Sequence, residues 1–534
     1  MAEAEGAAAL ALRTGAFDRL ARFARVRGKV PILYGSLDDH ADGATLTVHP
    51  CTQILFAAGR ALQVEGTLVA RGREDCRIQF TSSSLTPSPG AWGRVIFTST
   101  ATGSELDEQG NYVSGSILEY VDVLYAGSLS PGALVVQGSA GPILDDVRVA
   151  YSNYAGLSTS SANMPRIVDS VFEENSRGGV NVNNAVVFRG NLVANNSSYG
   201  ANVRFVNGDT EFVDNTFRSN QGTGVSFRGG NATVATGNWI IGTIGTGAYI
   251  EDGALPFEGN VMVGNRQGLF AESYGNTAPV VRNNIIVDNS TSGLGVSFYA
   301  YGDGAELVVE NNHLLNNGGT SSLGGEGVGI LRNNLIQGHT SGQAAIRLSF
   351  RAEYLEDLDF SGNAFVGDQV EPWFDVGAAS GSPFVDVTNN YWDGRAEPGA
   401  AINDFLVDPS RTVAIFDPVL LDAPTESPIS YPQDVEVELS GGVYTLVWAD
   451  NPEADLAGYR VFYGLSDQAY WELRGTGASE GDSGFEVMST TATVSGLDTS
   501  LPWRFSIAAF DSDADGDNDL FEGHESWPSR VAIP

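Results

Sequence analysis

The sequence predicts an all-β protein in which a parallel β-helix of about 14 coils precedes a β-sandwich. The first observation is a unit, Asn-x-apolar-x-x-Asn, that recurs through the middle of the chain. The second is the spacing of its first asparagines, 22 to 29 residues, which suits a coil of three short strands and three turns. The third is a final stretch of about 100 residues whose strands alternate in polarity, as in a sandwich.

The recurring asparagines are expected to stack in a ladder. A residue that recurs once per coil lies on its own copies, and asparagine tolerates left-handed turns while its amide bonds to the amides above and below. Their role is therefore structural, and the sequons at Asn195, Asn196 and Asn289 are not expected to carry glycans. The predicted ladder positions are Asn191, Asn215, Asn238, Asn260, Asn284, Asn312, Asn334, Asn363 and Asn390.

Similar strands begin earlier, at Leu46, and the β-helix is expected over residues 46–421. Cys51 and Cys76 each precede a short apolar strand and lie one repeat apart. Neighbouring coils lie about 4.8 Å apart, which is inside the Cα range of a disulfide. A disulfide is therefore predicted, with two buried thiols as the alternative. The bond would indicate an oxidising compartment.

Residues 1–45 are interpreted as a cap for the open end of the β-helix, because exposed strand edges must be covered. Residues 8–27 have the apolar spacing of an amphipathic helix, which caps the coils or, alternatively, docks a partner. The start, Met1-Ala-Glu-Ala-Glu5, is acidic and does not resemble a signal peptide. The apolar helix positions are Leu10, Leu12, Phe17, Leu20, Phe23 and Val26.

After the coils, residues 422–433 contain three prolines and are interpreted as a linker. A β-sandwich is expected over residues 434–534. Its residues 511–522 fit the calcium-loop pattern D-x-D-x-D-G-x5-E, although position eight is Asn518 and the flanks read as strands rather than helices. We expect weak calcium binding, with a solvated acidic loop as the alternative. The predicted ligands are Asp511, Asp513, Asp515, Asp517, Asp519 and Glu522.

Several segments carry a resemblance to known families. The stretch from Leu46 to Gly93, the segment Asn111–Tyr120, and Asn389-Asn-Tyr-Trp392 with Phe416–Leu421 resemble bacterial right-handed parallel β-helix repeat proteins of the pectate-lyase-like superfamily. Trp448, the strand 458–464 and Glu525–Ser529 resemble a fibronectin type III domain, a module that usually serves as a spacer or in binding. The resemblance implies the fold more than an activity, because this superfamily includes lyases, hydrolases, adhesins and non-catalytic scaffolds.

The motifs of the catalytic members are not found. The single lysine, Lys29, precedes the coils, and His313 and His339 fall at ladder positions, where turn residues are expected. Long coils offer acidic residues around Trp373, which would suit sugar stacking and acid catalysis, but a solvated acidic loop is the favoured interpretation. The same holds for the insertion 104–113, with Glu105, Asp107 and Glu108. The candidate catalytic residues are Glu353, Glu356, Asp357, Glu371 and Asp375.

The charge limits the partners. With 29 Lys and Arg residues against 65 Asp and Glu residues, the net charge of −36 disfavours nucleic acids and anionic membranes. No apolar run reaches the roughly 18 residues of a membrane span.

We therefore expect an extracellular or cell-surface scaffold of the adhesin type that binds glycans, contacts other surface proteins or self-assembles, is stabilised by calcium and is not catalytic. The alternatives are a polysaccharide lyase or glycoside hydrolase, and a subunit of a surface fibre or layer.

Overall fold

The structure is a computed structural model that describes most of the chain. The residues form two compact units, Met1–Ser273 (unit 1) and Tyr274–Pro534 (unit 2), and each is described by itself. The described residues are 24–27, 33–34, 45–138, 141–161, 164–204, 210–229, 233–252, 255–274, 277–299, 306–319, 321–326, 328–339, 344–350, 358–367, 371–376, 384–403, 412–465, 469, 485–516, 519–530 and 532–533.

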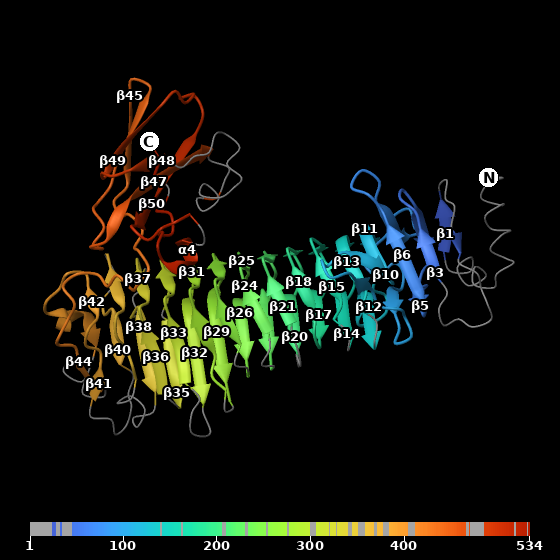
Figure 1. The fold of residues 1–534 in the computed structure, drawn as a ribbon, viewed down its shortest axis with the longest axis horizontal. Helices are drawn as coiled ribbons and strands as arrows, with labels where there is room; N and C mark the ends of the chain where they lie inside the picture. The colour runs from blue at the N-terminus through green and yellow to red at the C-terminus, as the bar shows by residue number, and fades with distance from the viewer. Residues whose placement is uncertain are drawn as a thin grey trace. The chain divides into compact units, whose positions relative to one another are not determined.

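Unit 1 winds into coils of three strands, and the strands of successive coils pair in parallel to make three faces (Figure 1). The long strands β11 (Ile117–Leu124) and β13 (Ile143–Ala150) belong to faces 1 and 2 at once. Face 1 also holds β3 (Thr45–Val48), β6 (Thr67–Arg71), β15 (Arg166–Val168), β18 (Val187–Arg189), β21 (Thr210–Val213), β24 (Thr233–Thr236) and β27 (Pro256–Glu258). Face 2 also holds β4 (Gln53–Phe56), β7 (Ile78–Ser82), β16 (Val171–Glu173), β19 (Leu192–Ala194), β22 (Thr216–Arg218), β25 (Trp239–Ile241) and β28 (Val261–Val263). Face 3 holds β5 (Leu62–Val64), β8 (Val95–Phe97), β12 (Gly132–Gly138), β14 (Ala155–Ser161), β17 (Gly178–Asn183), β20 (Tyr199–Arg204), β23 (Val225–Arg228), β26 (Thr246–Glu251) and β29 (Gln267–Ser273).

The coils of unit 2 have the same three faces. Face 1 holds β30 (Val280–Arg282), β33 (Glu306–Glu310) and β36 (Val328–Arg332), and β41 (Phe384–Asp386) pairs with β44 (Val413–Ile415). Face 2 holds β31 (Ile285–Val287), β34 (His313–Leu315), β37 (Leu335–Gln337), β39 (Ala364–Val366) and β42 (Tyr391–Trp392). Face 3 holds β32 (Ser292–Tyr299), β35 (Ser321–Glu326), β38 (Ile346–Phe350), β40 (Phe374–Val376) and β43 (Ile402–Asn403), which follows the 3-10 helix η1 (Pro398–Ala401). The units together contain about 13 turns, close to the predicted 14, and the predicted all-β parallel architecture is confirmed.

The core follows from the alternation of side chains along each strand. In β17, Val180 and Val182 point inward and are fully buried, whereas Asn181 between them is partly exposed. Large aromatic side chains fill the interior along the coils. The rings of Phe188 and Phe212 lie 5.0 Å apart between centroids.

The short strands of face 2 are bounded by left-handed corners. Around β19, Gly190 (φ +64°) and Asn195 (φ +55°) make the corners, and each is followed by an asparagine, Asn191 and Asn196. Glycine and asparagine adopt this conformation at little cost, which explains why they recur once per coil.

The predicted asparagines form ladders inside both units. In unit 1, the Asn191 Nδ2 donates to the Asn215 Oδ1 at 3.0 Å, and Asn215 donates to Asn238 at the same distance. In unit 2, Asn312 donates in the same way to Asn334 at 3.0 Å. The members are at most 3% exposed: Asn191, Asn215, Asn238 and Asn260 in unit 1, and Asn284, Asn312, Asn334, Asn363 and Asn390 in unit 2.

A second ladder, separate from the predicted positions, uses the last asparagine of each repeated unit. Asn175 donates to Asn196, and Asn196 to Asn220, both at 3.0 Å. In unit 2, Asn289 donates to Asn317 at 2.9 Å. Asn196 and Asn289 are fully buried, which prevents glycosylation at these two sequons.

The N-terminal edge of the coils is covered by strands. β1 (Ala24–Arg27) pairs antiparallel with β4, and β2 (Leu33–Tyr34) pairs antiparallel with β3. The helix expected over residues 8–27 is therefore wrong at its end, because Val26 belongs to β1 and its backbone satisfies the edge of β4. The remaining helix positions, Leu10 to Phe23, lie outside the described residues.

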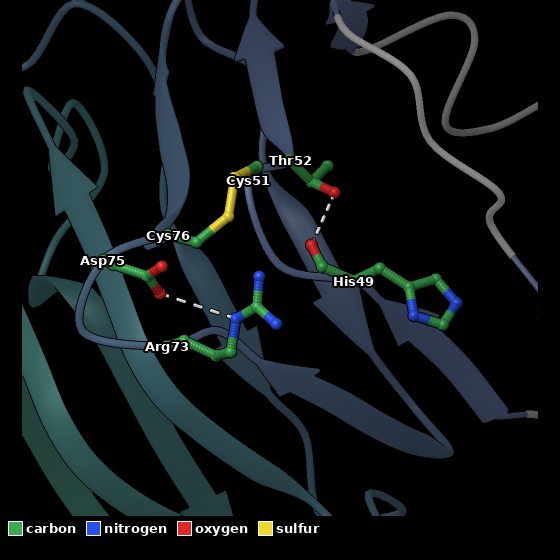
Figure 2. Close-up of a disulfide and its surroundings, with 6 residues drawn as sticks. All are labelled: His49, Cys51, Thr52, Arg73, Asp75 and Cys76. Atoms are coloured by element: carbon green, nitrogen blue, oxygen red, sulfur yellow. Dashed lines mark hydrogen bonds and ion pairs between the residues drawn. A yellow bond between two sulfur atoms is a disulfide. The ribbon is translucent and has the colours of Figure 1, made fainter.

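A disulfide joins Cys51 and Cys76 in unit 1 (Figure 2). The Cα atoms are 4.8 Å apart, which is the spacing of neighbouring coils. The Cys51 N–H also donates to the Cys76 carbonyl at 3.1 Å, so the bond links two corners that are already in contact.

The C-terminal part of unit 2 consists of two antiparallel sheets of three strands each. One contains β45 (Glu436–Ser440), β46 (Val443–Val447) and β49 (Thr491–Ser495), and the other β47 (Leu456–Leu465), β48 (Phe485–Val487) and β50 (Trp503–Asp511). A buried cluster, including Leu446, Trp448, Val461 and Phe505, takes side chains from both sheets, as in a sandwich. The helix α4 (Asp519–Glu522) follows β50. Among the described residues, helices long and apolar enough to span a membrane are absent.

The segment predicted as a linker is packed rather than free. Residues 427–432 are buried, and the Tyr431 backbone N–H and carbonyl both hydrogen-bond to the Gln337 side chain at 3.0 and 2.9 Å. The Tyr431 hydroxyl donates to the Asn316 Oδ1 at 2.7 Å. The linker interpretation is wrong because Ile429 and Tyr431 give this segment apolar area to bury.

Face 2 of unit 2 is apolar and buried where this segment binds. Leu335, beside Gln337 in β37, is fully buried, and so are Ile285 and His313 at the equivalent positions of β31 and β34. His313 therefore lies in a strand and not in the predicted turn. Arg530 adds an ion pair with Asp288 at 3.0 Å. The C-terminal sheets are thus tied to the coils of the same unit at several points.

Candidate functional site

The candidate site is a groove of about 760 Å³ on face 1 of unit 1. It crosses the strands β6, β11, β13, β15 and β18 and ends at Asp214, which follows β21. Its charged and aromatic lining includes Arg71, Tyr112, Glu119, Asp145, Arg166 and Asp169.

The parallel register brings the central side chains of the groove together. Arg71, Glu119 and Asp145 are direct neighbours on β6, β11 and β13. Glu119 and Asp145 follow the same apolar pair in two successive coils, in Ile117-Leu-Glu-Tyr120 and Ile143-Leu-Asp-Asp146. Adjacent strands lie about 4.8 Å apart, so the two carboxylates lie in consecutive rungs of one column.

The insertion 104–113 forms one wall of the groove. The strands β9 (Glu105–Leu106) and β10 (Tyr112–Ser114) pair antiparallel, and Tyr112 lines the groove. Asp107 accepts hydrogen bonds from the backbone and side chain of Asn111, at 2.8 and 3.0 Å, which holds the hairpin tip and lowers the pKa of Asp107. Glu105 accepts a bond from the Ser114 hydroxyl at 2.7 Å. Glu108 is exposed. This segment is therefore a built hairpin and not only a solvated acidic loop.

Carboxylates crowd the centre of the groove. The pKa of Asp145 is raised, first by burial and then by the negative charges of Glu119, Asp169 and Asp146, while Arg166 opposes the shift. Arg71 is held by Glu119 at 2.6 Å, and this hydrogen bond raises the pKa of Arg71. A carboxyl group with a raised pKa and a neighbouring carboxylate can act as an acid and a base towards a bound ligand.

A second hollow, of about 610 Å³, adjoins the groove at the corner that follows β6. The two share Arg71 and Glu119, and the second is also lined by Glu74, Asp75 and Tyr120. Tyr120 is a corner residue at φ +50°, an unusual conformation for a bulky side chain. The groove itself crosses several coils, so it can take an extended ligand that runs along them.

The predicted catalytic residues do not form a site among the described residues. Glu371 is exposed and pairs with Arg395 at 2.8 Å. Asp375 is 8% exposed in β40 and receives a hydrogen bond from Asn403 at 3.1 Å. Trp373 is 1% exposed, so its ring is not available for the sugar stacking that was the alternative to a solvated acidic loop. Glu353, Glu356 and Asp357 lie outside the described residues.

The acidic loop is partly satisfied by its own backbone. The Asp511 Oδ1 accepts hydrogen bonds from the N–H groups of Asp513 and Ala514 at 2.9 and 3.0 Å. The Asp519 carboxylate accepts those of Asp515 and Gly516, both at 2.9 Å. Asp519 and Glu522 belong to α4, a single helical turn inside the loop, and the strand β50 precedes the loop.

The loop as described does not gather its donors around one point. Asp513, Asp515 and Glu522 are exposed, and Asp517 lies outside the described residues. Across the described part of the chain, groups of three or more His, Cys, Asp or Glu side chains that could hold a metal ion are absent. The donor set suits calcium chemically, and the carboxylates of Asp511 and Asp519 keep lone pairs beyond those used by the backbone N–H groups.

The groove residues were missed by sequence reasoning, although a signal was present. The segments Ile117–Val123 and Ile143–Val149 repeat the same apolar pattern 26 residues apart, so Glu119 and Asp145 fall at equivalent positions. The pattern contains fewer asparagines than the later coils, which concealed the register. Alignment of these early coils by their apolar residues would have placed both carboxylates on one face.

Comparison with known proteins identifies the type of fold. Residues 106–262 match the family model described as the right handed beta helix region. A search of curated proteins found no match.

Two solved structures are similar at low scores. One is tailspike protein gp49 from Acinetobacter baumannii bacteriophage Fri1, a capsular polysaccharide depolymerase, with 10% identity, a TM-score of 0.19, and coverage of 89% of this chain and 77% of that chain. The other is full-length tailspike protein 2 from Escherichia coli O157:H7 bacteriophage CAB120, with 11% identity and a TM-score of 0.20, covering 88% of this chain and 64% of that chain. At these scores neither structure bears on the function of this chain.

Proposed function

We propose that this right-handed β-helix repeat protein is an extracellular or cell-surface protein that binds a polysaccharide strand in the groove on face 1 of unit 1. The observation that carries the proposal is the lining of the groove. Carboxylates, arginines and Tyr112 line it over five strands, and a second hollow adjoins it at Tyr120. Sugar hydroxyls need many polar partners spread along a chain, and a stack of parallel strands supplies them at a constant interval.

A glycan array tests this function. The protein is expected to bind at least one polymer of the array. The double variant Tyr112→Ala/Asp145→Ala should weaken that binding by about tenfold or more, because each substitution removes a contact worth roughly 1 kcal/mol. Glu438→Ala, on the exposed surface of β45, is the matched control and should bind as the wild type does. If the double variant bound the polymer as tightly as the wild type, the proposed location would be contradicted.

A second candidate function is glycoside hydrolysis in the same groove. Glu119 and Asp145 occupy adjacent rungs whose backbones lie about 4.8 Å apart, a spacing that lets their carboxyl groups adopt the roughly 5–5.5 Å separation of retaining glycosidases. Burial and the neighbouring carboxylates raise the pKa of Asp145, which suits a general acid. In that reaction Asp145 would protonate the leaving oxygen while Glu119 attacks the sugar and the glycosidic bond breaks. Water, deprotonated by Asp145, would then hydrolyse the glycosyl ester and free Glu119.

A reducing-sugar assay on each bound polymer separates the two functions. Hydrolysis predicts new reducing ends, and Glu119→Gln or Asp145→Asn should slow their appearance by about 10²- to 10⁴-fold. A polymer that is bound but never shortened would leave binding as the function of the groove.

The C-terminal sheets would serve this binding protein as a fibronectin type III-like module. In support of this proposal, Trp448 and Tyr459 lie in the core between the sheets, with ring centroids 5.2 Å apart.

Calcium at the acidic loop would stabilise the module, and 10 mM calcium should then raise its free energy of unfolding by about 1.4–2.7 kcal/mol if the dissociation constant is about 10⁻⁴–10⁻³ M. Thermal melts in calcium and in chelator, with Asp513→Asn as the control, test this. Equal melting temperatures would remove calcium from the proposal.

A further inference from the structure

We infer that the groove on face 1 of unit 1 takes an uncharged polysaccharide strand and rejects polyanions such as polyuronates. The inference rests on the proposed function and adds the class of ligand. It depends on the charges that line the groove and on the partners to which its arginines are already bound.

Two groove arginines are engaged by acidic side chains of neighbouring strands. Arg71 on β6 pairs with Glu119 on β11 at 2.6 Å, and Arg189 on β18 pairs with Glu211 on β21 at 2.8 Å. An arginine that recognises a carboxylate or sulfate of a ligand uses its guanidinium fork for that group. A polyanion would therefore have to displace Glu119 and Glu211, and each displaced carboxylate would remain beside it.

The third arginine faces an excess of carboxylates. Arg166 favours the ionised form of Asp145. Burial and the negative charges of Glu119, Asp169 and Asp146 together disfavour that form more strongly. A uronate bound between these strands would place another negative charge beside the carboxylates that already suppress the ionisation of Asp145. Repulsion of this kind excludes a ligand class even where the shape of the groove fits it.

The same side chains suit hydroxyl groups. Carboxylates accept hydrogen bonds, and the paired arginines retain N–H donors that their partners do not use. The floor includes Ile117 and Ile143, which are 3% and 5% exposed, and the wall includes Tyr112. A sugar ring has apolar faces and a polar rim, so an apolar floor beneath a polar lining matches it.

The extent of the groove indicates a polymer. It reaches from Arg71 on β6 to Asp214 after β21, across six neighbouring strands. Five intervals of about 4.8 Å make roughly 24 Å, which is longer than a single sugar. Because the strands are parallel and in register, a ligand that runs along the coils meets one lining side chain per rung, in the order Arg71, Glu119, Asp145, Val168 and Arg189.

The test compares binding of neutral polymers, polygalacturonate, alginate and chitosan to the full chain by calorimetry at low and moderate salt. The wild type is expected to bind a neutral polymer with an affinity that changes little with salt, and to bind the two polyuronates at least tenfold more weakly. The double variant Asp145→Asn with Asp169→Asn should gain at least tenfold in polyuronate affinity. Glu438→Gln, outside the groove, is the matched control and should not gain it.

Each other outcome has a distinct meaning. Tighter binding of a polyuronate by the wild type would overturn the inference and leave polysaccharide binding intact. Preference for chitosan over every neutral polymer would also overturn it, because the ligand would then be cationic. Binding of none of the polymers by the wild type or by the double variant would overturn both the proposed function and the inference. Circular dichroism of the variants confirms that each result comes from folded protein.

Discussion

At the scale of single residues, the buried asparagines have the most demanding roles. The Asn215 Oδ1 accepts hydrogen bonds from the backbone and side chain of Asn191, and its Nδ2 donates to the Phe188 carbonyl and to Asn238. All of its hydrogen-bonding atoms are used at zero exposure. Only an amide of this length offers an acceptor and two donors in this arrangement, because aspartate would lack the donors.

Asn215→Ala is therefore expected to lower the free energy of unfolding by about 3 kcal/mol, since it leaves buried partners in two neighbouring coils unsatisfied. Urea denaturation measures the change. Asn153→Ala, at an exposed position of unit 1, is the control and should stay within about 0.5 kcal/mol of the wild type. Equal effects of the two substitutions would show that the ladder does not stabilise the fold.

Asp145 illustrates a residue whose charge opposes folding. The pKa of Asp145 in the folded protein is raised above its unfolded value, so the folded state favours the protonated carboxyl group. This stabilisation is fully present below the unfolded pKa and is lost as the pH rises through the folded pKa. Asp145→Asn should therefore raise the melting temperature at about pH 7, and the gain should shrink towards zero at about pH 3. Thermal melts across this range measure the difference, and a gain that grows as the pH falls would reverse the assignment.

At the scale of elements, the first coils depend on the disulfide and on antiparallel edge strands. Cys51 and Cys76 close a loop with a sequence separation of 25 residues, next to the face 2 strands β4 and β7. The strand β1 satisfies the outer edge of β4, which would otherwise be open to pairing with another chain.

Replacement of both cysteines by serine is expected to cost about 3.5 kcal/mol of stability, because the unfolded chain regains the entropy of this loop. The comparison of melting curves for the wild type and the double variant measures it. Reductant should lower the melting temperature of the wild type and leave that of the variant unchanged. A reductant effect on both would point to a cause other than the disulfide.

At the scale of the whole chain, the C-terminal sheets are joined to the coils of unit 2 through residues 427–432. Tyr431 carries three of the hydrogen bonds, two through its backbone to Gln337 and one through its hydroxyl to Asn316. Burial raises the pKa of the Tyr431 hydroxyl to about 12, so it stays protonated and donates. A flexible linker would let the sheets move relative to the coils of unit 2, whereas this buried segment fixes them against face 2 of that unit.

Tyr431→Phe keeps the ring and removes the donor to the buried Asn316 Oδ1, so it should destabilise unit 2 by about 1–2 kcal/mol. Tyr431→Ala should cost more and should expose the segment to proteolysis after residue 421, because the buried ring also holds the backbone in place. Limited proteolysis followed by mass spectrometry detects the cut. Cleavage in this segment in the wild type at the same rate would restore the linker interpretation.

The sequence by itself determined the features that repeat. Asparagine once per coil, with apolar residues between, indicates the coil and its ladder, because stacked copies interact in the same way at every rung. The spacing of Cys51 and Cys76 likewise indicates their contact, and the alternation after residue 434 indicates antiparallel strands.

Only the tertiary structure decided what depends on contacts between unlike segments. It placed the hairpin of β9 and β10 beside Glu119 and Asp145 to make the groove, buried Trp373 in the core, and bound Tyr431 to Gln337. The physical reason is that a repeat specifies its neighbours through identical side chains, whereas a single copy of a hairpin or a segment binds wherever its own apolar area and hydrogen bonds are best satisfied.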